Sequence, residues 1–109
     1  MLKKTYRLSS VRIKSPKTIN SESFSIKWTK NSLSYPRFGF VISKRIDSRA
    51  VVRNSLKRKL SGCIEEIFDK IEGGNDFVIY PKPKAVHTNR GEILKEMKKA
   101  LAKKDPSND

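Results

Sequence analysis

The stretch Ala50–Phe68, AVVRNSLKRKLSGCIEEIF, combines an apolar stripe with a dense basic flank. Apolar residues recur through it at spacings of three and four, which is the period of a helix packed against a core. The residues of this stripe are Val52, Leu56, Leu60, Cys63, Ile64, Ile67 and Ile71. Asp47 and Ser48 can supply N-cap oxygens before the stripe, and the glycines within residues 72–76 can end it. The pattern therefore predicts a helix over residues 50–71.

Strand patterns lie on both sides of this helix. Residues 24–29 and 37–44 both alternate apolar with polar or small side chains, as half-buried strands do. We expect these two strands to pair, with 37–44 central in the sheet because it carries apolar side chains on both faces. Residues 77–80, FVIY, predict a short buried strand, and residues 89–104 predict a second helix. This order predicts an α+β fold, a small two-layer sandwich with helices packed on a mixed sheet.

The composition points to a polyanionic partner. The 109 residues include 25 Lys and Arg against 11 Asp and Glu, a formal net charge of +14. Such a charge destabilises a small fold by self-repulsion and is typical of proteins that bind nucleic acid. The length predicts one domain over residues 1–109, with residues 1–20 loosely ordered or briefly helical and residues 105–109 a flexible tail.

Several classes of function are excluded by what the sequence lacks. No apolar run approaches the roughly 20 residues of a membrane span, and the N-terminus has no signal-peptide core. Cys63 is the only cysteine and His87 the only histidine, and the acids form no cluster suited to metal-assisted phosphodiester cleavage. We therefore expect a cytoplasmic protein with no membrane partner, no small-molecule substrate, no catalytic residue and no tightly bound metal.

The first half of the helix carries its cations on one flank. At 100° per residue, Arg53, Asn54, Lys57 and Ser61 lie beside the apolar stripe, and Arg58 extends this flank outward. Arginine binds phosphate through a fork of two N–H groups and lysine as a point charge. Arg49 lies in the first turn, where unpaired backbone N–H groups attract anions. A solvated face that only keeps the protein soluble is the alternative, but the basic segment just before the helix favours nucleic acid.

Strand and helix together resemble the protein subunit of bacterial ribonuclease P. That family has an F-G-hydrophobic-x-S-K-K/R strand followed by an Arg-Asn-Arg segment and Lys-Arg on a helix. The matching residues here are Phe38, Gly39, Phe40, Ser43, Lys44, Arg45, Arg53, Asn54, Lys57 and Arg58. The resemblance covers about residues 33–103, including the later DFVIYPKP segment. Ser55 departs from the resemblance, because this serine occupies the position of the second arginine in the family segment. The N-terminal region, where family members carry a helix with an aromatic residue facing a cleft, is abbreviated.

The resemblance implies a role in an RNA-based enzyme. In this family a large RNA subunit is the catalyst, and the holoenzyme removes the 5′ leader of precursor tRNA by hydrolysing one phosphodiester. The resemblance thus implies one protein per ribonuclease P RNA, a protein that is inactive alone, and Mg²⁺ held mainly by RNA. It also implies a left-handed β-α-β crossover, whereas the general rule favours a right-handed one for parallel strands.

The same resemblance divides the candidate residues between two surfaces. The surface for the RNA subunit comprises Arg49, Arg53, Asn54, Lys57 and Arg58. The surface for the precursor-tRNA leader comprises Trp28, Phe38, Phe40, Ser43, Lys44 and Arg45. Aromatic rings can stack on unpaired bases of any sequence, and Phe38 is the first candidate for that role. Ordinary core packing is the alternative for Phe24, Trp28 and Phe40.

Other nucleic-acid-binding functions remain as alternatives. A ribosomal or other structural rRNA-binding protein would share the size, charge and architecture, and only the spacing of strand and helix favours ribonuclease P. A DNA-binding module would need a recognition helix or a dimer interface, and neither pattern is visible. A protein-only nuclease would need more clustered acids.

Overall fold

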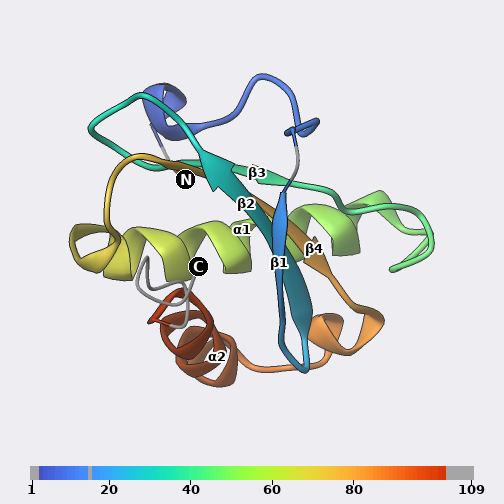
Figure 1. Cartoon of the computed structure of the whole chain (residues 1–109). Coiled ribbons are helices and arrows are strands. Elements are labelled where there is room, and N and C mark those ends of the chain that lie inside the picture. The colour runs from blue at the N-terminus through green and yellow to red at the C-terminus, as the bar shows by residue number, and fades with distance from the viewer. Residues whose placement is uncertain (1–2, 15, 103–109) are drawn as a thin grey trace.

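The computed structural model describes residues 3–14 and 16–102 of the chain (Figure 1). The strands are β1 (Lys17–Asn20), β2 (Phe24–Lys30), β3 (Arg37–Phe40) and β4 (Asn75–Pro81), and the α-helices are α1 (Ala50–Ile67) and α2 (Arg90–Ala102). Three short 3₁₀ helices also lie in the described residues, η1 (Lys4–Tyr6), η2 (Phe68–Lys70) and η3 (Pro83–Val86).

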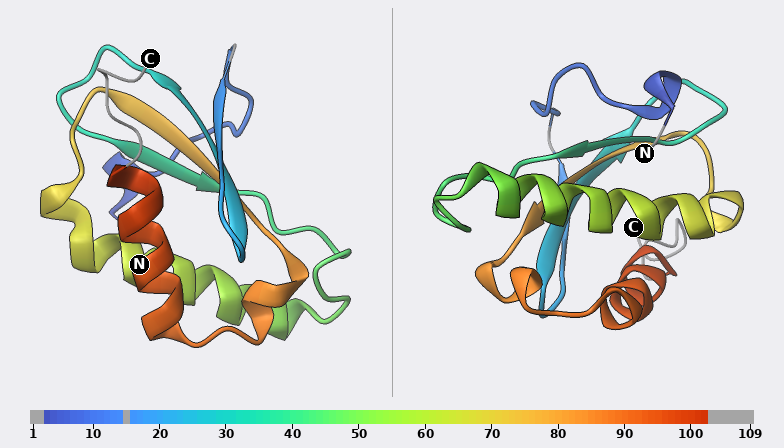
Figure 2. Two further views of the ribbon diagram at one scale, coloured as in Figure 1. Left: turned by 60° about the horizontal axis from the view of Figure 1, so that its bottom comes forward. Right: turned by 180° about the vertical axis from the view of Figure 1, so that it is seen from behind.

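The four strands form one mixed sheet in the order β1-β2-β4-β3. Strand β2 is antiparallel to both β1 and β4, and β3 is parallel to β4. Phe77 on β4 stands opposite Trp28 on one side and Phe38 on the other, so their side chains share one face of the sheet. Both α-helices cover this face, as Figure 2 shows. The predicted α+β class, with helices on a mixed sheet, is confirmed.

The hydrophobic core lies between the sheet and the two helices. It contains Phe24, Ile26, Phe77 and Ile79 from the sheet, Leu56, Leu60, Cys63, Ile64 and Ile67 from α1, and Ile93, Met97 and Ala100 from α2. The apolar stripe predicted for α1 is therefore its buried face. Only its two ends, Val52 and Ile71, are half-exposed. The stripe continues past Ile67 because η2 follows α1 directly.

The position of β3 in the sheet corrects the expectation from sequence. The prediction that residues 37–44 pair with β2 and lie centrally is wrong, because β3 ends at Phe40 and forms an edge. The central position belongs to β4, whose Phe77, Val78 and Ile79 are completely buried. Parallel pairing of β3 with β4 makes α1 the crossover connection between them. The hand of that crossover stays a prediction.

Strand β1 was not expected from the sequence. Residues 1–20 were predicted to be loosely ordered or briefly helical, and η1 fits that description, but β1 pairs with β2 along its whole length. Only Ile19 of β1 is partly buried, so the strand has almost no apolar pattern. It is an edge strand held by backbone hydrogen bonds, which leave no signal in side-chain periodicity. The predicted flexible tail, residues 105–109, lies outside the described residues.

The β1–β2 turn is fastened to α2 through the carboxylate of Glu96. The Ser23 hydroxyl and the Ser21 hydroxyl each donate to it at 2.6 Å, and the Ser23 backbone N–H donates at 2.9 Å. Burial alone would raise the pKa of this carboxyl, but the three hydrogen bonds outweigh burial and lower the pKa. The charged carboxylate therefore ties β1 and β2 to α2.

We expect this contact to make the stability depend on pH. Because the pKa of Glu96 is lower in the folded protein, its contribution is complete above the ordinary value of 4.5 and is lost as the pH falls through the folded value. Urea denaturation at pH 7 and at decreasing pH below 4.5 measures the loss. Glu96→Gln is expected to flatten that dependence, and an equally steep fall in this variant would contradict the assignment.

The loops that precede β3 and β4 touch closely. The Asn31 N–H donates to the Gly74 carbonyl at 2.9 Å, and the Asn31 amide donates to Asp76 at 2.7 Å. Asp76, only 7% exposed, also accepts two hydrogen bonds from the Arg37 guanidinium, at 2.8 and 2.9 Å. A Cβ added at Gly73 would overlap the Ser34 carbonyl group. Glycine at position 73 is therefore required by the close approach of the two loops.

Gly73→Ala is expected to destabilise the fold by about 1–3 kcal/mol, since backbone atoms have to shift to admit the methyl group. The matched control is Gly62→Ala inside α1, where the nearest atom lies 3.5 Å from the added Cβ. That change is expected to stabilise the protein by up to about 1 kcal/mol, through helix propensity. Urea denaturation of both variants tests these two expectations. A loss of stability in Gly62→Ala, or no loss of stability in Gly73→Ala, would contradict this packing.

Candidate nucleic-acid interface

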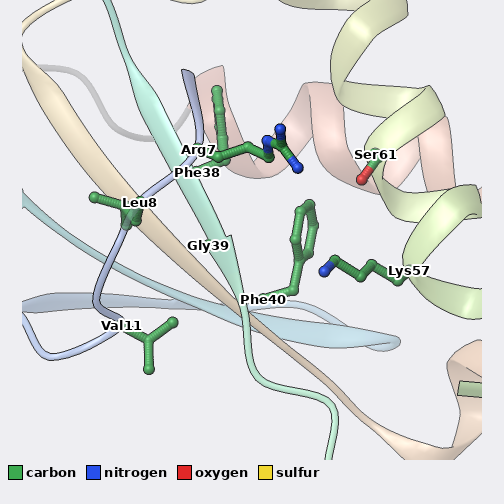
Figure 3. Close-up of a pocket in the computed structure, with 8 residues that line it drawn as sticks. All are labelled: Arg7, Leu8, Val11, Phe38, Gly39, Phe40, Lys57 and Ser61. Atoms are coloured by element: carbon green, nitrogen blue, oxygen red, sulfur yellow. The ribbon is translucent and has the colours of Figure 1, made fainter. Parts of the chain in front are cut away.

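A cleft of about 130 Å³ opens between the N-terminal segment, β3 and α1 (Figure 3). Its lining residues are Arg7, Leu8, Val11, Phe38, Gly39, Phe40, Lys57 and Ser61. The N-terminal segment is held at the edge of β3 because the Leu8 N–H donates to the Phe38 carbonyl at 2.9 Å. Gly39 allows this approach, since a Cβ there would lie 3.0 Å from Val11 Cγ1. The cleft is thus walled by three segments that are distant in sequence.

Cations and an aromatic ring meet in this cleft. In Figure 3 the Phe40 ring lies between the side chains of Arg7 and Lys57, and Ser61 faces them from α1. Arg7 and Lys57 are exposed and Phe40 is half-exposed, so a ligand can reach all three. A ring flanked by two cations suits a single-stranded nucleic acid, whose bases stack while its phosphates pair with the cations.

The structure changes the set of aromatic candidates. Phe38 is 1% exposed and Trp28 5% exposed, and both lie in the hydrophobic core. The Phe38 ring stacks on Phe77 with 5.2 Å between the ring centroids. Neither residue has a free ring face for a base, which corrects their assignment to the leader surface. Phe24 is also completely buried. Phe38 also lines the cleft, but Phe40 is the predicted aromatic residue whose ring is accessible there.

The N-terminal segment supplies residues that sequence reasoning missed. Arg7, Leu8 and Val11 line the cleft, although no periodic pattern marks them. Tyr6 on η1 packs against Phe68, with 4.6 Å between ring centroids, and against Tyr35 at 5.4 Å. These contacts anchor the segment beside β3. A signal for them is absent from the sequence because the bridge between Arg7 and Phe38 joins segments about thirty residues apart.

The outer flank of α1, as the helical spacing defines it, is only partly open, because Arg53 is half-exposed and Ser61 is 2% exposed. Asn54, Ser55, Lys57 and Arg58 are exposed. Lys59 points inward instead, and its ammonium group donates to the Ala85 carbonyl at 2.9 Å and to the Thr88 carbonyl at 2.7 Å. Burial lowers the pKa of Lys59. This lysine therefore ties α1 to the connection between β4 and α2.

The segment before α1 is a tight turn that presents Ser43, Lys44 and Arg45 to solvent. The Ile46 N–H closes the turn by donating to the Ser43 carbonyl at 3.0 Å. The Arg53 guanidinium braces the following residues, because its Nη1 donates to the carbonyls of Asp47 and Ser48 at 2.9 and 2.8 Å.

Asp47 is paired with Arg49 and does not cap α1. The N-cap residue of α1 is Arg49, and no side chain caps the helix. The Asp47 carboxylate accepts hydrogen bonds from the backbone N–H of Arg49 at 2.9 Å and from its guanidinium at 2.9 and 3.0 Å. Hydrogen bonds from the Arg49 side chain and backbone lower the pKa of Asp47 to about 2. Of the five residues predicted to contact the RNA subunit, Arg49 and Arg53 thus have intramolecular partners, and Asn54, Lys57 and Arg58 are exposed.

The described residues contain no group of three His, Cys, Asp or Glu side chains that could hold a metal ion. Neither α1 nor α2 has the length and apolar character needed to cross a membrane, within the part of the chain described here. A small mixed sheet, a helix with exposed cations and a cleft that holds an aromatic ring between two cations define the class: basic α+β proteins suited to a polyanion.

A family model described as Ribonuclease P matches residues 1–105. The chain belongs to the ribonuclease P protein family, in agreement with the resemblance seen in the sequence. One relative, the ribonuclease P protein component of Microcystis aeruginosa, is 40% identical over 67 residues, covering 62% of this chain and 56% of the relative. The corresponding protein of Bacillus cereus is 31% identical over 96 residues, covering 88% of this chain and 83% of the relative. The alignment spans just over half the length of the first curated relatives.

Solved structures show the same fold. The ribonuclease P protein of Thermotoga maritima superposes with a TM-score of 0.78 at 24% identity, covering 84% of this chain and 86% of that one. The Staphylococcus aureus protein gives a TM-score of 0.78 at 21% identity, covering 89% and 93%. At these identities the likeness concerns the fold alone.

Proposed function

We propose that this chain is the protein subunit of ribonuclease P, which binds the catalytic RNA and promotes removal of the 5′ leader from precursor tRNA. Family membership supports the subunit role. The observation that carries the proposal is the cleft in which Arg7 and Lys57 flank the Phe40 ring, beside the exposed cations of α1. The holoenzyme is then an endoribonuclease with two RNA partners, its own RNA subunit and precursor tRNA.

The leader of precursor tRNA binds in the cleft. A single-stranded leader can place one base on the exposed face of Phe40 and its phosphates near Arg7 and Lys57. Ser43, Lys44 and Arg45 lie on the turn that follows β3, so they extend the same surface along the strand. Stacking and charge do not depend on base identity, which suits an enzyme that accepts leaders of many sequences.

The RNA subunit binds along the outer flank of α1, with one protein per RNA. Asn54, Lys57 and Arg58 are exposed there and can contact phosphates and 2′-hydroxyls. Arg53 supports this surface by holding the preceding turn in place. Lys57 lies at the junction of the two surfaces, because it both lines the cleft and stands on the flank.

In this proposal the RNA subunit performs the catalysis, and the protein alone is inactive. Mg²⁺ is held mainly by RNA and substrate. The donor set of the described residues does not fit a protein-held site, since no three candidate ligands gather. The contribution of this chain is to bind the leader, hold its phosphates and screen their charge beside the RNA subunit.

Reconstitution tests the proposal. Purified protein, the ribonuclease P RNA of the same organism and precursor tRNA are mixed at low Mg²⁺, and leader removal is followed. We expect the protein to stimulate cleavage of a substrate with a long leader more than one with a single-nucleotide leader. Phe40→Ala should reduce that difference and leave the short-leader rate unchanged. A protein that binds RNA but leaves cleavage unchanged would be a structural RNA-binding protein instead.

A further inference from the structure

A single acid lies within the proposed RNA-binding surface. Between Glu22 and Glu65 the only acidic residue is Asp47. Residues 43–59 contain seven Lys and Arg against this one carboxylate. An acid among so many cations lowers the attraction for RNA, unless it improves a particular contact.

The geometry of the pair between Asp47 and Arg49 shows which contact the Asp47 carboxylate can improve. Oδ1 of Asp47 accepts from Nε of Arg49 at 3.0 Å, and Oδ2 accepts from Nη2 at 2.9 Å. This is a side-on pair that uses two of the five guanidinium N–H donors. The end of the guanidinium, formed by Nη1 and the second N–H of Nη2, is left for another acceptor. The Arg49 side chain is 71% exposed, whereas that of Asp47 is 17% exposed.

The backbone under this pair is itself held in place. Arg53 donates to the carbonyls of Asp47 and Ser48, and the Asp47 carboxylate also accepts the Arg49 backbone N–H at 2.9 Å. The low pKa of Asp47, about 2, keeps its carboxylate charged in any neutral solution. Arg49 is therefore fixed at the surface, at the start of α1.

We propose that Asp47 is a positioning residue for RNA binding, which holds the Arg49 guanidinium side-on so that its end can bind a backbone phosphate of the RNA subunit. This inference rests on the proposed function. Arginine has a large rotamer entropy, and a side chain already held in its bound orientation loses less of it on binding. The phosphate then contacts a fork that is fixed before the RNA arrives.

The proposal and simple electrostatics predict opposite signs. Asp47→Asn removes a negative charge from a basic surface, so charge alone would tighten RNA binding. Loss of the positioning contact is expected instead to weaken binding of the ribonuclease P RNA about three- to tenfold. The amide oxygen of asparagine can still accept the Arg49 backbone N–H, and Arg53 still braces the turn, so the fold is retained.

A double-mutant cycle separates positioning from general loosening of the turn. Filter binding gives the Kd for the RNA with wild-type protein, Asp47→Asn, Arg49→Ala and the double variant. We expect Asp47→Asn to weaken binding in the wild-type background and to have no weakening effect once Arg49 is alanine. The matched control is Glu66→Gln, which breaks the exposed ion pair with Arg90 at 3.0 Å and changes the charge equally. It should leave the Kd unchanged or slightly lower.

The outcomes distinguish this inference from the proposed function. Tighter or unchanged binding by Asp47→Asn overturns the inference, and so does an equal weakening in the Arg49→Ala background. If the wild-type protein does not bind the RNA at all, the proposed function fails, and the positioning role fails with it.

Discussion

Phe38→Ala is expected to destabilise the protein by about 3–5 kcal/mol, the usual cost of deleting a buried aromatic ring. The Phe38 side chain is 1% exposed and stacks on Phe77, so its removal leaves a cavity between β3, β4 and η2. The free energy of unfolding from urea denaturation measures the loss. A small domain with that deficit is expected to be partly unfolded at growth temperature.

Phe40→Ala provides the control from the same strand. Its ring is half-exposed at the edge of the core, so we expect a clearly smaller loss of stability than for Phe38→Ala. We expect it to reduce binding of the leader, whereas Phe38→Ala acts only through unfolding. If Phe38→Ala left the stability unchanged and removed leader binding, its assignment to the leader surface would be restored.

The double variant Lys57→Ala/Arg58→Ala is expected to weaken binding of the ribonuclease P RNA strongly. Both side chains are exposed on the proposed surface. Each phosphate contact that is lost lowers the slope of log Kd against log salt concentration by roughly 0.7–0.9, so the double variant should lose between one and two units. Titrations at several salt concentrations give both the affinity and the slope.

Lys95→Ala/Lys98→Ala is the matched control. It removes the same charge from the exposed side of α2, outside the proposed surface. Its affinity should fall far less and its slope should stay near the wild-type value. Equal losses in both double variants would mean that net charge alone determines binding, which is the solvated-face alternative.

Local periodicity was sufficient to predict the helices and most strands. The apolar stripe of α1 repeats every three or four residues, and burial of Leu56, Leu60 and Ile64 follows directly from it. The alternation in residues 24–29 likewise predicts β2. These elements are determined by neighbours in the sequence, so a pattern of side chains reveals them.

Which strands pair with each other in the sheet could not be predicted in this way. Phe38 stands opposite Phe77, and the alternation within β3 is compatible with either β2 or β4 as its neighbour. For the same reason the sequence did not reveal that Phe38 is buried and Phe40 half-exposed. Alternation assigns both rings to one face, and only the packing of α1 and η2 over that face separates them.

Within the candidate site, the exposure of side chains on α1 was easier to predict from the sequence than the contacts that each side chain makes. The basic flank of α1 is exposed at Asn54, Lys57 and Arg58, as the helical angle indicated. The structural role of Arg53 could not be predicted, because its hydrogen bonds go to backbone carbonyls of a turn that has no sequence pattern. Arg7 was missed since its position depends on a bridge to β3.

One wall of the cleft, the N-terminal segment, is attached to β3 by only a few contacts of its described residues and adds to a sheet that is formed without it. The described residues before β1 are all at least partly exposed, and the Leu8 hydrogen bond and the Tyr6 ring attach them to a sheet that is already complete. None of the described residues of that wall belongs to the hydrophobic core. The N-terminal segment can therefore vary in length and composition at little cost to folding, and with it the width and charge of the cleft. A protein built in this way can change the surface proposed for the leader while it keeps the surface proposed for the RNA subunit.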